Sequence, residues 1–537
     1  MRCALVFCLT ACTTSGSLDL DLELPQSSGL RPQGMTTVTV LASSADMPET
    51  ENTSLLDGSS FAAGDLPVDN QVQIDVLLRD ESSRLVGVGE AEQRVDIVAD
   101  RTTDLTIQVR KPFVYASDGK TLYSYDPTLD SRDPSFQGKV AGVASPIAVV
   151  PVGGSELAIG EPGEVQIIDT ATDVVSQKSI ALPSGATLHD LAPVPGTHQI
   201  AIAHSMGISI ADLDSLAINT AAVGSVDRVT VGPGSDGKMV AYGLVGAAKP
   251  ASSPLVACTG TSSLIAVSVD SPQTGTPTAL PDAVAGIAAA PDQAALFAVA
   301  PCTGEVDKVG GTLGFGDAPA SGPITLDKVS SLPNAAVIAV LSDRVWAAGT
   351  ASSTAVCESG SCSTSTQIGC PEPSGNHLAY TQTGAHLIVQ SIPIAGGDTT
   401  EIDLPARTET MINTDDPAHQ HAQVLNSLGD VPTDLVVLPG DQYISLVTQS
   451  QYYIESLTDG PPPDNILLPC LLGTTGDWLL IDSASTSIAA RVRTECNLTV
   501  GPSDFFTMWQ CGDTAAGEGS TNGDYMPTTV GALFGAR

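Results

Sequence analysis

Residues 147–160, IAVVPVGGSELAIG, contain an apolar segment, a turn that begins at Pro151 and a second apolar segment. Short segments rich in Val, Ile and Ala are typical of β-strands. Pro followed by Gly-Gly is typical of a tight turn, because Pro presets φ and Gly accepts a left-handed conformation. The stretch therefore predicts a β-hairpin, and the question is how often this hairpin recurs.

The same strand–turn–strand pattern recurs along the chain. Six further stretches carry it: DLAPVPGTHQIAIA (190–203), DRVTVGPGSDGKMVAYG (227–243), GIAAAPDQAALFAVA (286–300), DKVSSLPNAAVIAVLSD (327–343), IGCPEPSGNHLAYT (368–381) and DLVVLPGDQYISLVT (434–448). The anchor prolines of the seven units are Pro151, Pro195, Pro233, Pro291, Pro333, Pro373 and Pro439. They are separated by 44, 38, 58, 42, 40 and 66 residues, and most of these gaps suit one four-stranded propeller blade. Since no blade can bury both of its faces alone, the repeat predicts seven blades that stack radially, with insertions in the two long gaps. Six or eight blades are the alternatives.

Through these units, residues 111–510 resemble the seven-bladed β-propellers of the YVTN/NHL-like kind. The resemblance lies in pattern and period, and the sharper tetrapeptides of that family are missing. It implies a β-propeller over 111–537 and almost nothing about activity. The segment FVYASDGKTLYSYD (113–126) predicts an extra hairpin that pairs with strands near the C-terminus and closes the ring, which would remove exposed edge strands.

The region before the repeats has a different pattern. In LDLDLELP (18–25), leucines alternate with acidic residues, which predicts a strand with one buried face. Similar alternation over 18–110 predicts about seven short strands without cysteine, as in an immunoglobulin-like β-sandwich. The chain is thus expected to be all-β, with this sandwich acting as a spacer before the propeller.

The N-terminus, MRCALVFCLTAC, has one basic residue and then a short apolar run. Its end, Leu9-Thr10-Ala11-Cys12, resembles the lipobox of bacterial lipoproteins. The resemblance implies a signal peptide over 1–11, lipidation of Cys12, and a small polar tether over 12–17. It also implies an outer-membrane lipoprotein of the cell envelope, facing the periplasm or the cell surface and touching the membrane only through its lipid. The leader is shorter than usual, so a start further upstream is one alternative, and a plain terminal strand is the other.

Cysteine usage agrees with export. Eight cysteines follow Cys12: Cys258, Cys302, Cys357, Cys362, Cys370, Cys470, Cys496 and Cys511. An even number suits up to four disulfide bonds in an oxidising compartment. Connectivity is open, although Cys357–Cys362 and Cys470–Cys496 would be local pairs. The rival interpretation, a zinc site, is disfavoured because CESGSC lacks the C-x2-C spacing and has no nearby histidine.

The charge balance restricts the partners. The chain has 22 Lys and Arg against 60 Asp and Glu, a net charge of -38. The electrostatic field of a protein with this negative net charge repels nucleic acid and favours cations or basic partners. Nucleic acid is therefore excluded as a partner, and an envelope protein or another extracytoplasmic ligand is expected.

One loop is a candidate cation site. Asp415, Asp416, His419 and His421 lie within the segment 408–430, inside the longest gap. Carboxylates and imidazoles together suit divalent ions such as Zn, Ni or Mn. However, two imidazoles at i and i+2 converge only on an extended backbone, so a solvated polar loop is the favoured interpretation. No other cofactor is predicted.

Catalytic motifs are missing from the sequence. It contains no G-x-S-x-G, P-loop or H-E-x-x-H, and its two SDGK segments predict turns between strands. His189, His198 and His204 are expected to be turn or rim residues, and Trp478 a core residue. The favoured function is a non-catalytic binding or scaffolding platform. The alternatives are a propeller hydrolase, lactonase or lyase with its site at the channel mouth, and a purely structural lipoprotein.

Overall fold

The fold is described from a computed structural model of the whole chain. The structure describes residues 15–26, 29–44, 50–56, 58, 60–91, 93–117, 121–129, 137–152, 156–170, 174–250, 258–273, 276–311, 323–341, 343–351, 354–357, 378–381, 386–405, 408–413, 422–438, 442–457, 472–483, 485–499, 509–513 and 529–534. Within these ranges all regular secondary structure is β-strand, and no helix is present, so the prediction of an all-β chain is confirmed. The chain divides into two compact units, Met1–Lys111 and Pro112–Arg537.

The first unit is built on one β-sheet. Its described strands are β1 (Ser15–Glu23), β2 (Thr37–Ser43), β3 (Thr50–Leu55), β4 (Ser60–Pro67), β5 (Asp69–Arg79), β6 (Leu85–Glu90), β7 (Val95–Ile97) and β8 (Thr102–Arg110). Their order is β3-β2-β5-β6-β8-β1-β4, and β7 pairs with β5. β1 runs parallel to β8, whereas the other pairs are antiparallel.

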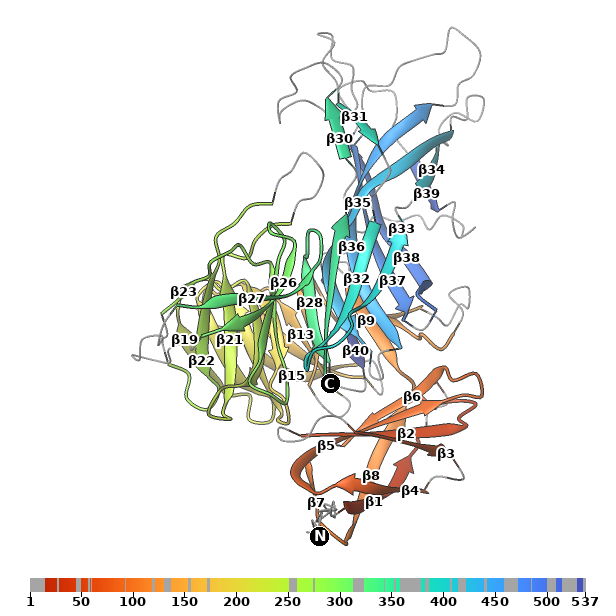
Figure 1. Cartoon of the computed structure of the whole chain (residues 1–537), viewed down its shortest axis with the longest axis vertical. Helices are drawn as coiled ribbons and strands as arrows, with labels where there is room; N and C mark the ends of the chain where they lie inside the picture. The colour runs from red at the N-terminus through yellow and green to blue at the C-terminus, as the bar shows by residue number, and fades with distance from the viewer. Residues whose placement is uncertain are drawn as a thin grey trace, which may run out of the picture. The chain divides into compact units, whose positions relative to one another are not determined.

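The strands of this unit enclose one core. Leu18, Leu20 and Leu22 are buried in it, as their alternation with acidic residues predicts. They pack with residues of β2, β4, β5, β6 and β8, since all of these strands contribute to the same hydrophobic cluster. Figure 1 shows β2, β5 and β6 on one side of this unit and β1, β4 and β8 on the other.

The second unit contains seven sheets arranged as blades, which we number along the chain. Blade 1 is β9 (Phe113–Ser117), β10 (Leu122–Tyr125), β11 (Gln137–Val140) and β40 (Thr529–Phe534); blade 2 is β12 (Ala148–Pro151), β13 (Glu156–Glu161), β14 (Glu164–Asp169) and β15 (Val174–Ala181). Blade 3 is β16 (Leu188–Pro193), β17 (Gln199–His204), β18 (Gly207–Asp212) and β19 (Ile218–Ala222); blade 4 is β20 (Arg228–Pro233), β21 (Met239–Val245), β22 (Ser263–Ser268) and β23 (Thr278–Ala279). Blade 5 is β24 (Gly286–Ala289), β25 (Leu296–Ala300), β26 (Glu305–Gly310) and β27 (Thr325–Ser331); blade 6 is β28 (Val337–Leu341), β29 (Arg344–Ala351), β32 (His386–Pro393) and β33 (Thr400–Pro405).

Blade 7 is larger. It consists of β35 (Ala422–Val437), β36 (Tyr443–Leu457), β37 (Leu472–Asp482) and β38 (Ser487–Thr499), and it is extended by β34 (Thr408–Asn413) and β39 (Trp509–Asp513). β34 pairs with the first part of β35, residues 422–426. The last part of β35 serves as the innermost strand of blade 7. Blade 6 carries a separate hairpin, β30 (Thr354–Cys357) and β31 (Leu378–Thr381).

The blades form a closed ring. The innermost strands β12, β16, β20, β24, β28, β35 and β40 contact one another in this order, and β40 contacts β12. β40 pairs antiparallel with β9, so the end of the chain completes the blade that 113–126 begins. The predictions of seven blades and of closure by this hairpin are confirmed.

One of the seven predicted units was placed incorrectly, and another lies mostly outside the described residues. Pro333 lies between β27 and β28, so it marks a connection between blades and not the first hairpin of a blade. The first hairpin of blade 6 is instead β28–β29, which turns without a proline after Leu341. Pro373 lies outside the described residues, in the segment between β30 and β31. The hairpin at 113–126 supplies the seventh blade, which explains why the count was nevertheless correct.

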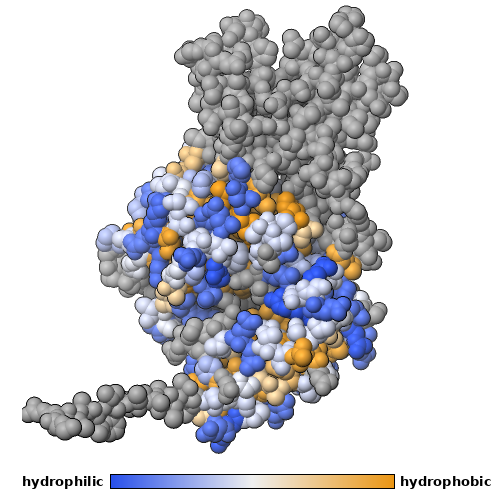
Figure 2. Space-filling view, turned by 45° about the vertical axis from the view of Figure 1, so that its right-hand side comes forward, coloured by the Kyte–Doolittle hydropathy of each residue, from blue (hydrophilic) through white to orange (hydrophobic). Residues whose placement is uncertain are grey.

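The described surface carries both hydrophilic and hydrophobic residues. Figure 2 shows hydrophilic and hydrophobic residues interspersed on the described part of one face. The large hydrophobic residues that are exposed lie on separate strands and turns, and include Leu55, Val174 and Met206. Within the described ranges, no helix is long and apolar enough to cross a membrane.

Candidate functional site

The two faces of the propeller differ in their connections. In a four-stranded antiparallel blade, the connection between the second and third strands and the link from one blade to the next lie on the same face. This face carries the long β21–β22 connection of blade 4 (246–262), the β30–β31 hairpin of blade 6 and the β34–β39 extension of blade 7. Figure 1 shows β30, β31, β34 and β39 beyond the same ends of the blades. We call it the insertion face.

Three charged side chains occupy the same position on three innermost strands. Asp190 in β16, Arg228 in β20 and Asp434 in β35 each lie five residues before the anchor proline of their blade. The chain enters each innermost strand from the insertion face, so this position is near that end of the channel. We call these residues the charged triad.

The members of the charged triad interact across the ring. Blade 7 lies opposite blades 3 and 4 in a ring of seven, yet Arg228 and Asp190 both shift the pKa of Asp434. An electrostatic interaction between charges on opposite blades indicates that their side chains face the central channel. All three side chains are half-buried, as expected for groups that line a narrow channel.

Asp190 is fixed by backbone hydrogen bonds. Its Oδ1 accepts from the N–H of Leu191 at 2.9 Å, and its Oδ2 accepts from the N–H of Val229 at 3.0 Å. The second bond joins the innermost strands of blades 3 and 4. Burial raises the pKa of Asp190, and Arg228 is the main charge that opposes this rise.

Asp434 has fewer partners. Its Oδ1 accepts from the N–H of Leu435 at 2.7 Å, whereas no described residue donates to its Oδ2. Burial raises the pKa of Asp434 to about 6; Arg228 lowers it and Asp190 raises it. Asp434 is therefore the carboxyl group of the charged triad with unused hydrogen-bonding capacity.

The connection 246–262 is anchored beside the triad. Asp227, which precedes Arg228, accepts hydrogen bonds at Oδ2 from the N–H groups of Gly246 at 2.7 Å and Ala247 at 2.9 Å. Gly246 has φ of 72°, and a Cβ there would lie 2.4 Å from the carbonyl oxygen of Thr261. A side chain at this position would therefore separate the two ends of the connection.

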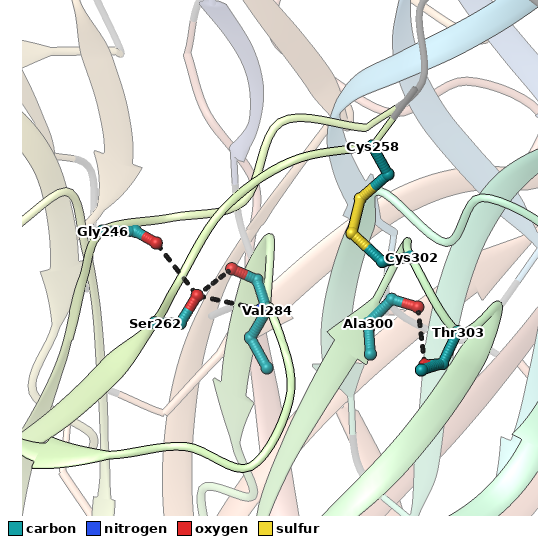
Figure 3. The surroundings of a disulfide bond; sticks show 7 residues. All are labelled: Gly246, Cys258, Ser262, Val284, Ala300, Cys302 and Thr303. Carbon is teal, nitrogen blue, oxygen red and sulfur yellow. Dashed lines mark hydrogen bonds between the residues drawn. A yellow bond between two sulfur atoms is a disulfide. The ribbon is translucent and has the colours of Figure 1, made fainter. Parts of the chain in front are cut away.

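A disulfide bond fastens the same connection to the next blade. Cys258 in the connection is bonded to Cys302, which lies between β25 and β26 of blade 5 (Figure 3). At the base, the Ser262 hydroxyl donates to the carbonyl oxygens of Gly246 and Val284 and accepts from the N–H of Val284 (Figure 3). The connection is thus held at its base by Asp227 and Ser262 and at its side by the disulfide.

Two histidines of blade 3 make internal contacts, and His204 is a buried strand residue where a turn or rim position was predicted. His204 is fully buried, its Nε2 lies 2.8 Å from Ser209 Oγ, and burial lowers its pKa. His189 Nδ1 lies 2.8 Å from the carbonyl oxygen of Val226. These contacts hold His204 within blade 3 and tie His189 to the segment that leads into blade 4.

His198 joins two blades on the face opposite the insertions. Its Nε2 lies 3.0 Å from Glu156 of blade 2, and its Nδ1 lies 2.8 Å from Asp214 of blade 3. The two ring nitrogens of His198 thus bridge blades 2 and 3.

Most of the other predicted site residues lie outside the described ranges. Cys12, Cys362, Cys370 and Cys470 are outside them, as are Asp415, Asp416, His419 and His421. For Cys357, Cys496 and Cys511 only the backbone is described. Within the described part of the chain, no group of three His, Cys, Asp or Glu side chains is arranged to hold a metal ion. The SDGK turn at 235–238 is present, with Gly237 at φ 76°.

Sequence reasoning missed the charged triad. None of its three residues was predicted as a site residue. The signal was present: aligning DLAPVPG, RVTVGPG and DLVVLPG on their prolines places the three charged residues in one column. Only the closed ring shows that this column faces a shared channel.

Comparison with known proteins shows similarity of fold only. No protein-family model and no curated protein matches the chain. Among solved structures, hydrazine synthase of Kuenenia stuttgartiensis is 13% identical with a TM-score of 0.34, covering 65% of this chain and 95% of that one. The tricorn protease is 8% identical with a TM-score of 0.36 (84% and 44%), and a chain of the nidogen/laminin complex is 8% identical with a TM-score of 0.29 (54% and 92%).

Proposed function

We propose that this chain is an exported, lipid-anchored protein of the bacterial cell envelope, whose propeller binds an extracytoplasmic partner at the insertion face. An immunoglobulin-like sandwich, residues 18–110, separates the lipid on Cys12 from the propeller. The propeller is a non-catalytic docking platform, of the YVTN/NHL-like kind.

The observation that carries the binding proposal is the charged triad. Three blades place charged side chains at one level of the channel, near the face that also bears the insertions. Propellers present rigid connections around a channel, and binding groups on such scaffolds gather there. The fastening of the 246–262 connection by a disulfide supports both a preformed surface and an oxidising compartment.

The location is tested by expressing the full chain in a Gram-negative host. Intact mass spectrometry of the membrane fraction is expected to find a chain that begins at Cys12 and carries acyl groups. The Cys12→Ser variant is expected to lose the acyl mass and leave the membrane fraction. A wild-type chain that keeps residues 1–11 contradicts lipid anchoring.

The binding role is tested by capture of envelope proteins on the immobilised propeller. A partner is expected to be retained by the wild-type chain and by Asp398→Asn, an exposed substitution on the β32–β33 connection of the opposite face. It is expected to be lost with Asp434→Asn. Equal capture by all three chains would contradict binding at the insertion face.

An enzyme is the second candidate, and one observation favours it. A carboxyl group with its pKa raised to about 6, on which an arginine acts electrostatically, can serve as a general acid or base. Lactone, ester and polyuronate substrates incubated with the wild-type chain and with Asp434→Asn test this candidate. Turnover that depends on Asp434 would replace the non-catalytic role.

A further inference from the structure

We propose that the charged triad binds a cationic nitrogen, an ammonium or guanidinium group presented by a basic segment of a partner protein, with Asp434 as its direct acceptor. The proposal deepens the proposed function, on which it rests, by naming the chemistry of the ligand.

The charges within the triad do not balance. The triad contains two carboxylates, Asp190 and Asp434, and one guanidinium, that of Arg228, so its net charge is one negative charge when both acids are ionised. A half-buried charge without a partner is less well solvated than an exposed one, so a ligand cation that pairs with it gains more than it would in water. An anionic ligand would have to bind Arg228 in competition with two carboxylates.

The two carboxylates are not equivalent. Both oxygens of Asp190 already accept backbone N–H groups, from Leu191 and Val229. Asp434 uses one oxygen, and within the described residues nothing donates to the other. A new donor is therefore expected to bind at Asp434, while the charge of Asp190 makes the electrostatic potential there more negative.

The other charged groups around Asp434 do not cancel its preference for a cationic ligand. Arg228 and Asp190 are the charges that act on it, and His189 acts on Asp190 from the same strand. The net charge of -38 attracts a basic segment over a longer range. This attraction accelerates encounter, whereas the triad provides the specific contact.

The test uses the full chain and three synthetic peptides of identical Gly-Ser background that carry lysines, glutamates or alanines. Calorimetric titration at pH 8 and 150 mM salt is expected to show binding of the lysine peptide alone. Asp434→Asn is expected to weaken this binding by about 10–100-fold, the usual range for a lost charged hydrogen bond. Asp398→Asn changes the net charge equally at an exposed position on the opposite face and is expected to leave the affinity unchanged.

Two further measurements separate the proposal from a structural role of Asp434. Arg228→Gln removes the competing cation and is expected to tighten binding of the lysine peptide at pH 8, which a merely damaged site would not do. Binding by the wild-type chain is expected to weaken as the pH falls through about 6, because Asp434 becomes protonated. Thermal unfolding of each variant verifies that it is folded.

The outcomes distinguish the two proposals. Equal weakening by Asp434→Asn and Asp398→Asn would reveal diffuse charge attraction and overturn the inference. Preference for the glutamate or alanine peptide would also overturn it, even if an envelope partner is captured through Asp434. Lysine-peptide binding that depends on Asp434, in a chain that carries no lipid and captures no envelope protein, would sustain the inference and contradict the proposed function.

Discussion

Tyr125 of blade 1 stacks on Trp478 of blade 7, with ring centroids 4.3 Å apart and an interplanar angle of 12°. Trp478 is fully buried, and its Nε1–H donates to Ser445 Oγ at 2.9 Å. The two rings join the first and last blades, so the seam at which the ring closes is fastened by an aromatic pair as well as by β40.

Removing this pair is expected to weaken the closed ring. Trp478→Ala should lower the free energy of unfolding by about 3–5 kcal/mol, because it leaves a large cavity and an unstacked Tyr125. Trp478→Phe keeps an aromatic face and should cost clearly less. Urea unfolding followed by far-UV circular dichroism measures both values. An equal loss in the two variants would show that stacking contributes little at the seam.

Closure by β40 makes a separate prediction. A chain that ends at residue 528 lacks the strand that pairs with β9, so blade 1 loses its innermost strand and exposes an edge. This chain is expected to unfold at lower temperature and to aggregate, as measured by calorimetry and light scattering. The matched control ends at Phe534 and keeps β40. Identical melting of the two truncated chains would contradict closure through this strand.

The Cys258–Cys302 disulfide is expected to stabilise the propeller. It closes a loop with a sequence separation of 44 residues, for which the chain-entropy model gives about 4 kcal/mol as an upper value. The double variant Cys258→Ser/Cys302→Ser should therefore unfold at lower denaturant concentration. A reductant should destabilise the wild-type chain more than the double variant. Peptide mapping without reduction should recover the two cysteines in one linked fragment, and their recovery in separate fragments would refute the pairing.

Asp307 is expected to make stability depend on pH. Its side chain is buried; burial, then Glu305 and Asp282, raise its pKa from 3.8 to about 6. The folded chain therefore holds the proton more tightly than the unfolded chain, and the resulting stability is full below about pH 4 and lost as the pH rises through about 6.

The substitution Asp307→Asn should remove this part of the pH dependence. The melting temperature of the variant, relative to the wild-type chain, should rise between pH 4 and pH 8. Asp398→Asn removes a carboxylate from an exposed position and should follow the wild-type profile. Parallel profiles for the wild-type chain and Asp307→Asn would contradict the raised pKa.

Most of the fold was predictable because strands and turns are encoded locally. The alternation of Leu18, Leu20 and Leu22 with acids identified a buried strand face, and the hairpin at 113–126 indicated how the ring closes. Pro333 misled because proline favours any turn, and a turn between blades uses the same residue as a turn within one. The β28–β29 hairpin carries no proline, so a search centred on proline could not find it.

The candidate site was less predictable because it is assembled across the ring. Nothing near Asp434 in the sequence indicates Arg228, and the two act on one another electrostatically only when blade 7 lies opposite blade 4. The pKa of Asp434 depends on burial in the channel, which exists only after closure. Local sequence patterns therefore identified the blades but not the charged triad.

The pairing of β40 with β9 has a kinetic consequence. Nearly the whole second unit separates these strands along the chain, so blade 1 stays incomplete until the final segment leaves the ribosome. Contacts between such distant segments form slowly, because a long loop must be closed before they are made. During synthesis the nascent chain holds an open arc of blades, and docking of β40 closes that arc into the native ring.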